Sequence, residues 1–235
     1  MISLNEPSII FIVSLLYFSI FYNDYDKIKL ANVFVRVIHG LGCIYYISPL
    51  IIENNYQLSD ITNTGNQSDY IFVINRSISY FLWDMFALLF EDEEEKLLFL
   101  AHHLLTIVAI YSGIVCPDNT YNIVLGILIG EITNPLHQAM DFNKIIKNRN
   151  ISVEILYLFF IMLSRLGIGT CALLSTINDV SSLDEVSNGC IYSYSISIIT
   201  YILLIPLSFN WSHKKFQSIL KYLRPPINKY IFIYS

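Results

Sequence analysis

The sequence predicts an all-α protein, a polytopic transmembrane helical bundle with about seven spans. Of its 235 residues, 54% are hydrophobic and 14% are charged, and the mean hydropathy is +0.54. This composition argues against a water-soluble fold. The apolar residues also form runs close to the roughly 20 helical residues that cross a ~30 Å hydrocarbon core. The net charge of -5, with the basic residues scattered over short loops and the tail, predicts no nucleic-acid partner.

The predicted spans cover residues 8–22, 31–52, 70–90, 97–115, 121–140, 151–175 and 191–209. The first run is rather short and ends at the polar segment 23–27. No positively charged residue precedes it and no small-residue cleavage site follows it, so we expect a retained span and not a signal peptide. Asp84 interrupts the third run and Pro135 interrupts the fifth.

Lysine and arginine gather in alternate loops, and this partition predicts the orientation of the spans. Positive residues in short loops stay on the cytoplasmic side of a membrane. One set of alternate segments holds Lys27, Lys29, Lys96, Lys144, Lys147, Arg149, Lys214, Lys215, Lys221, Arg224 and Lys229. The opposite set holds only Arg76, at the edge of a span. We therefore expect seven crossings, with a lumenal N-terminus and a cytosolic C-terminus.

Two features concern the segments assigned to the lumen. Asn66 begins a glycosylation sequon in the long polar loop, whereas a second sequon, at Asn150, falls on the cytosolic side and should stay unmodified. Cys116 and Cys190 lie at lumenal span ends, where the redox environment permits oxidation. The sequence leaves two interpretations open, a disulfide between Cys116 and Cys190 or four unpaired, buried cysteines.

Several ionisable residues lie inside the predicted spans. Such groups are costly at membrane depth and normally face the bundle interior or a water-filled cavity, so each is a candidate site residue. From a rise of ~1.5 Å per residue, we place a histidine or a carboxylate from each of four helices roughly 8 to 14 Å from the cytosolic side. These residues are His39, Asp84, His102, His103 and Glu131. Arg36 is shallower and can snorkel to the interface, and Arg165 lies deeper.

The adjacent residues His102 and His103 cannot point in the same direction, because neighbouring helical residues project about 100° apart. One can serve chemistry or ligand binding while the other bonds a neighbouring helix. A hydrogen bond to Asp84 would set the tautomer of an imidazole and raise its basicity, as a general base requires. The same bond can also act only to hold two helices together, and the residues alone leave both roles open. Metal binding is disfavoured, because adjacent histidines cannot chelate as an i, i+4 pair does.

In the fifth span, polar residues surround a proline at mid-membrane. Pro135 removes one helical hydrogen bond and frees a carbonyl group, so a kink lined by Glu131 and Asn134 is expected. Two interpretations remain for this segment. It is either a plain proline kink or the opening of a lipid-accessible cavity beside Glu131.

Taken together, these motifs resemble the TLC domain family over roughly residues 36–211. The resemblance rests on RVIH at 36–39, SYFLWD at 79–84, HH at 102–103 and EITNP at 131–135. It implies an endoplasmic-reticulum-type protein in which the last six spans enclose a central, lipid-accessible cavity holding the histidine pair. The chain is then divided into an N-terminal span with its cytosolic loop (1–30), a TLC domain (31–211) and a basic cytosolic tail (212–235). The short chain resembles the small TLC domain-containing proteins more than full ceramide synthases.

The resemblance implies three functions, of which binding, sensing or handling of membrane lipids is favoured. The second is N-acylation of a sphingoid base, with acyl-CoA as co-substrate and His102, His103 and Asp84 as catalytic candidates. The His-Asp motif and second aspartate that ceramide synthases carry downstream have no clear counterpart in residues 126–141, so catalysis stays undecided. The third function is that of a secretory-pathway cargo receptor. Arg36, His39, Glu131 and Asn134 are the expected cavity or lipid-binding residues; no cofactor or metal is expected, and a homodimer is left open.

Overall fold

The described part of the chain is helical apart from short turns and connections, as the sequence predicts. The computed structural model describes residues 25–53, 67–90, 96–182 and 188–223, and no strand occurs within these ranges. The helices are α2 (Tyr25–Glu53), α3 (Gln67–Phe90), α4 (Lys96–Val115), α5 (Thr120–Glu131), α6 (Asn134–Ile145), α7 (Ile151–Ile161), α8 (Gly169–Ser182) and α9 (Asn188–Leu223). A 3-10 helix, η2 (Pro117–Asn119), precedes α5, and a π-helix, η3 (Met162–Ile168), joins α7 to α8. The predicted fold class is confirmed for these residues.

Among the described residues, five helical stretches are long and apolar enough to cross a membrane: Lys29–Ile52, Ser68–Leu89, Lys96–Val115, Ile151–Ser181 and Asn188–Leu223. The predicted fifth span is divided between α5 and α6, of 12 residues each. Together they have the length of one crossing, about 36 Å at the helical rise. The predicted first span and Asn66 lie outside the described residues, so the count of seven spans is not confirmed.

The break between α5 and α6 lies at Ile132 and Thr133. Pro135 stands in the first turn of α6, where its missing N–H and constrained φ are tolerated. The predicted kink therefore appears as a two-residue turn in which Ile132 and Thr133 keep right-handed helical dihedral angles. The seventh helix also differs from its predicted range, because α9 continues from residue 209 to Leu223 and makes the first part of the predicted tail helical.

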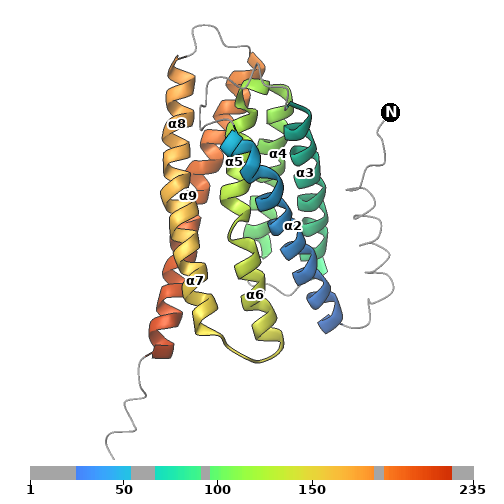
Figure 1. Cartoon of the computed structure of the whole chain (residues 1–235), viewed down its shortest axis with the longest axis vertical. Helices are drawn as coiled ribbons and strands as arrows, with labels where there is room; N and C mark the ends of the chain where they lie inside the picture. Colours follow the sequence, from blue (N-terminus) through green and yellow to red (C-terminus); the bar gives the residue numbers. More distant parts are fainter. Residues whose placement is uncertain (1–24, 54–66, 91–95, 183–187, 224–235) are drawn as a thin grey trace, which may run out of the picture.

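The helices form one elongated bundle (Figure 1). Helices α8 and α9 lie along one side, α2 and α3 along the other, and α5 and α6 follow one another between them. The start of α2, the end of α6, the start of α7 and the end of α9 share one end of the bundle. We call it the basic end, defined by Lys29, Lys96, Lys144, Lys147, Arg149, Lys214, Lys215 and Lys221. The charge partition noted in the sequence thus corresponds to the two ends of the bundle.

The largest apolar core lies between α2, α3 and α5, where Ile47, Ile74 and Val124 are completely buried. The outward faces are also apolar, with Phe34, Leu97 and Phe209 among many exposed large side chains. A helix that is apolar on all sides is typical of a membrane environment, where lipid covers the outer face.

The opposite end of the bundle holds a disulfide between Cys116 and Cys190, and we call it the disulfide end. Next to it, the buried amide of Asn119 donates hydrogen bonds to the hydroxyl groups of Ser193 and Ser197. These contacts tie η2 to α9. Of the two remaining cysteines, Cys43 is buried and Cys171 is exposed.

Removing the disulfide is expected to destabilise the bundle. The bond closes a loop across a sequence separation of 74 residues, and its loss typically costs about 2 to 4 kcal/mol. Replacement of both Cys116 and Cys190 by serine should lower the thermal midpoint measured in detergent. Cys171→Ser, which removes an exposed free thiol, should leave the midpoint unchanged. Equal midpoints for the double variant and wild type would contradict this expectation.

Gly40→Ala is expected to disturb the contact between α2 and α6. A Cβ atom at Gly40 would lie 2.8 Å from Cδ of Pro135 and 3.2 Å from Cβ of Asn134. The proline ring cannot rotate away, so the helices must separate, at a cost of about 1 to 3 kcal/mol. Gly130→Ala is the matched control, because no atom lies within 4 Å of its Cβ position. Thermal unfolding should show a lower midpoint for the first variant only; a similar loss in both would refute the steric explanation.

Candidate functional site

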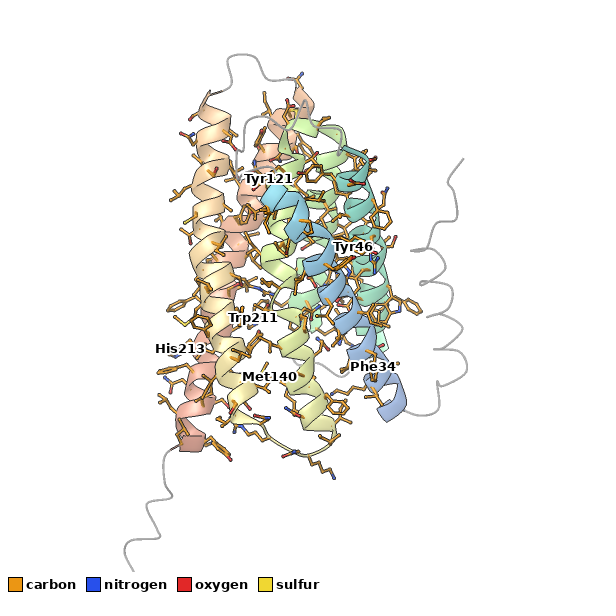
Figure 2. All side chains as sticks on the ribbon, viewed as in Figure 1. Phe34, Tyr46, Tyr121, Met140, Trp211 and His213 are labelled. Carbon is orange, nitrogen blue, oxygen red and sulfur yellow. A yellow bond between two sulfur atoms is a disulfide. The ribbon has the colours of Figure 1, made fainter. Side chains whose placement is uncertain are left out.

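A cavity of about 600 Å³ extends from the basic end into the bundle. Its wall mixes ionisable groups with the apolar side chains of Phe81, Leu88, Phe99 and Trp211. Trp211 and Met140, both in this wall, lie between α9 and α6 at the basic end (Figure 2). The charged and imidazole residues of the wall are Lys29, Arg36, Asp84, His102, His103, Glu131, His137, Asp141, Lys144, Arg165, Lys214 and Lys215.

Asp84 joins three helices at the inner part of this cavity. Nε of Arg36, on α2, donates to Oδ1 of Asp84 at 2.7 Å. Nε2 of His103, on α4, lies 2.9 Å from Oδ2 of the same carboxylate. The side chains of all three residues are largely buried. A buried charge is stable only when it is paired, so Asp84 compensates Arg36 and connects α2, α3 and α4.

Both ring nitrogens of His103 are occupied. Nδ1 lies 2.6 Å from the carbonyl oxygen of Phe99, and a carbonyl oxygen can only accept, so Nδ1 carries a proton. The other nitrogen, Nε2, faces the carboxylate of Asp84. With both nitrogens engaged inside the bundle, His103 holds helices together and has no position left to take a proton from a ligand.

His102 differs from His103 in its burial and in the partners of its ring. It is only half-buried, and its ring lies in the cavity wall, edge-on to His103 with centroids 5.5 Å apart. No hydrogen bond or ion pair of its imidazole is found within the described ranges of the chain. The two histidines therefore divide the roles that the sequence left open, and His102 has the ring available to a ligand.

His39 and Glu131 form a second polar group next to the first. Nε2 of His39 lies 3.8 Å from Oε2 of Glu131, and the His39 ring stacks on Tyr80 with centroids 3.6 Å apart. The amide of Asn134, at the start of α6, donates to Oε2 of Glu131 at 2.9 Å. It also lies 3.4 Å from the hydroxyl oxygen of Tyr80. The helix break thus places Asn134 where it binds α5 and α3 together.

Arg165 lines the cavity from the side of the bundle formed by α7, η3 and α8. It lies in the π-helix η3, donates to the carbonyl oxygen of Gly130 beside the break between α5 and α6, and sits above the ring of Trp211 at 5.9 Å. Its Nε atom is buried and has no hydrogen-bond partner in the described chain. Short π-helical segments are frequent at functional sites.

The structure brings most of the predicted site residues together. Asp84, His103 and Arg36 form one group, His39, Glu131 and Asn134 form the other, and His102 lies beside the first. The expectation that Arg36 snorkels to the interface is wrong, because its side chain is 12% exposed and pairs with Asp84. The shallow position of Arg36 in its span did not indicate that Asp84, on another helix, is its partner.

Arg165 was a candidate because of its depth in the membrane, whereas no site role was predicted for Tyr80 or Trp211. Tyr80 lies in the SYFLWD motif at 79–84, but Trp211 has no signal in the sequence that separates it from other apolar positions. The described residues that come nearest to a metal-ligand cluster are Cys116, Asp118 and Cys190, and there the two sulfur atoms are bonded to each other.

Long apolar helices around a buried polar cavity define the class of the chain, an integral membrane protein. The family model of the TLC domain matches residues 28–217. The chain belongs to the TLC domain family. A search of curated protein sequences finds no match to it. The matched region begins near the start of α2 and ends within α9, so it contains every residue of the two polar groups.

Proposed function

We propose that this TLC protein binds a membrane lipid in its cavity, as part of sensing or handling that lipid. The observation that carries the proposal is the cavity of about 600 Å³ with apolar walls and buried polar groups. This volume lies within the usual range of small-molecule sites. The apolar side chains of the wall suit an acyl chain, and its many polar groups suit a headgroup or a hydroxyl group.

Photocapture of lipids from native membranes tests this proposal. A photoreactive phenylalanine analogue at Phe99, in the cavity wall, should capture a restricted set of lipids. The matched position is Phe209, which is 64% exposed on the outer face of α9, and there the captured lipids should reflect the bulk membrane. No lipid at position 99, or the same mixture at both positions, would contradict lipid binding in the cavity.

A second function, transfer of an acyl group from acyl-CoA to a sphingoid-base amine, is favoured by one observation. The imidazole of His102 lies in the cavity beside the His103–Asp84 pair with no partner in the described chain. As a general base, His102 would accept the amine proton while the nitrogen bonds the acyl carbon, and would then donate that proton to the thiolate released when the carbon–sulfur bond breaks. The products are an amide and the free thiol of CoA.

The enzymatic function is tested with purified protein, oleoyl-CoA and sphinganine. The expected result is N-oleoyl sphinganine with wild type and with His213→Ala, which removes an exposed histidine of the same bundle, and no product with His102→Ala. Absence of product with wild type and a series of acyl-CoA chain lengths would exclude the acyltransferase while leaving lipid binding intact.

The proposed orientation places the basic end in the cytosol and the disulfide end in the lumen of the endoplasmic reticulum. The charges at the basic end and the oxidised Cys116–Cys190 pair at the other both support this arrangement. In sealed microsomes, an introduced cysteine at Lys147 should react with a membrane-impermeant maleimide added outside. Protection of that cysteine until the membrane is opened would reverse the orientation.

A further inference from the structure

A second, smaller cavity of about 410 Å³ lies at the basic end. It adjoins the main cavity, since Met140, Lys144, Lys215 and Ser218 line both. Its remaining wall comes from the end of α6, the following loop and the start of α7. A molecule bound here therefore lies next to the larger cavity.

The smaller cavity carries an excess of positive charge. Lys144, Lys147, Arg149 and Lys215 line it, against the single carboxylate of Glu154. Asp141 lies outside this wall and pairs with Lys144 at 2.7 Å. Even with Asp141 counted, two positive charges remain uncompensated among the described residues around this cavity. The site is thus suited to an anion.

Lys215 is the cation of this cavity that is best placed to contact such an anion. Glu154 accepts from Arg149 through both oxygens, at 2.8 and 2.9 Å. The ammonium group of Lys215 remains 3.8 Å from Glu154, although its side chain is only 19% exposed. Because Arg149 already binds both oxygens of Glu154, the ammonium group of Lys215 has donor capacity left for a further acceptor.

Neighbouring groups extend this donor set. Asn143, Asn150 and Ser218 contribute amide and hydroxyl groups to the wall. Arg149 is held in place because it also donates to the carbonyl and hydroxyl oxygens of Ser218. Lys147 adopts a φ of 55° at the end of α6, a conformation in which glycine is preferred. The position nevertheless carries a lysine, which adds a charge at the rim.

We infer that the smaller cavity binds the phosphate monoester of an anionic amphiphile whose acyl chain occupies the main cavity. A phosphate monoester carries about −1.5 to −2 charges at pH 7 and three acceptor oxygens. That charge matches the uncompensated pair of cations better than a carboxylate does. This inference rests on the proposed lipid binding and specifies the bound lipid as a phosphate-bearing amphiphile. The phosphate can belong to a lipid headgroup or to the nucleotide of an acyl-CoA.

Equilibrium binding to the purified full chain in detergent tests this inference with three probes of equal acyl chain. They are 1-oleoyl-lysophosphatidate, oleoyl-CoA and the uncharged 1-oleoylglycerol. At least one phosphate probe should bind about ten-fold or more tightly than 1-oleoylglycerol, the effect expected of one charge-assisted hydrogen bond. Preference for lysophosphatidate identifies a lipid headgroup, and preference for oleoyl-CoA alone identifies the nucleotide.

Lys144→Gln with Lys215→Gln should reduce this preference to within about two-fold. The control, Lys96→Gln with Lys221→Gln, removes the same charge from positions outside both cavities and should retain it. If the variant with Lys144→Gln and Lys215→Gln fails to fold, Lys147→Gln, at an exposed position, replaces it. The preference for the phosphate probe should then fall about three-fold, the effect of one screened surface charge. Equal binding of all three probes to wild type, or a preference that survives these substitutions, overturns the phosphate site alone. Absence of binding by every probe, 1-oleoylglycerol included, overturns the proposed lipid binding as well.

Discussion

Asp84→Leu is expected to destabilise the bundle by about 3 to 5 kcal/mol, because it leaves the buried Arg36 guanidinium without its carboxylate. The loss should appear as a large decrease in the thermal midpoint in detergent and as a lower yield of folded protein. His103 loses its acceptor at the same time, so the contacts of α3 with both α2 and α4 are weakened.

A second substitution separates charge compensation from packing. Arg36→Met combined with Asp84→Leu removes both charges and keeps apolar volume, which is often neutral for a buried ion pair. The double variant should therefore recover most of the stability lost by Asp84→Leu. If the double variant is as unstable as the single one, the ion pair does not account for the effect of Asp84.

His103→Ala and His102→Ala are expected to affect different properties. His103 bonds Asp84 and the carbonyl oxygen of Phe99, so its loss should lower the thermal midpoint, with about 1 to 3 kcal/mol for the unpaired buried groups. His102 lies in the cavity wall, so its removal should leave the midpoint nearly unchanged and reduce photocapture at position 99 by about ten-fold, the effect of one lost polar contact to a ligand.

The exposed His213 provides the control for both measurements, because His213→Ala should alter neither stability nor lipid capture. The contrast between the two cavity histidines is the informative result. Equal losses of stability in both variants would refute the division of roles, as would a normal lipid yield from His102→Ala.

Much of the fold follows from periodicity and hydrophobicity. The ranges of α3 and α4 were predicted closely, since polar loops bound them on both sides. The kink at Ile132 and Thr133 was predicted from Pro135, because a proline shows where a helical hydrogen bond is lost. The extension of α9 to Leu223 was missed, since it is amphipathic and charged and lies beyond the apolar run.

The candidate site was predicted at the level of depth and not of partners. A common depth correctly brought Asp84 near His103 and His39 near Glu131, because helices in a membrane bundle run nearly parallel. The depth of a residue in the membrane does not show how its helix is rotated about its own axis. The sequence therefore could not decide which histidine faces the cavity. The pairing of Arg36 with Asp84 could not be predicted for the same reason, because it also depends on how the two helices are rotated.

Native mass spectrometry of the purified protein tests the central claim most directly. The account predicts a chain that retains one lipid of a restricted mass range after detergent is removed in the gas phase. His102→Ala should lose most of this lipid, and His213→Ala should retain it. A wild-type chain that is bare, or one that carries a ladder of bulk lipids unaffected by either substitution, would contradict a lipid-binding cavity.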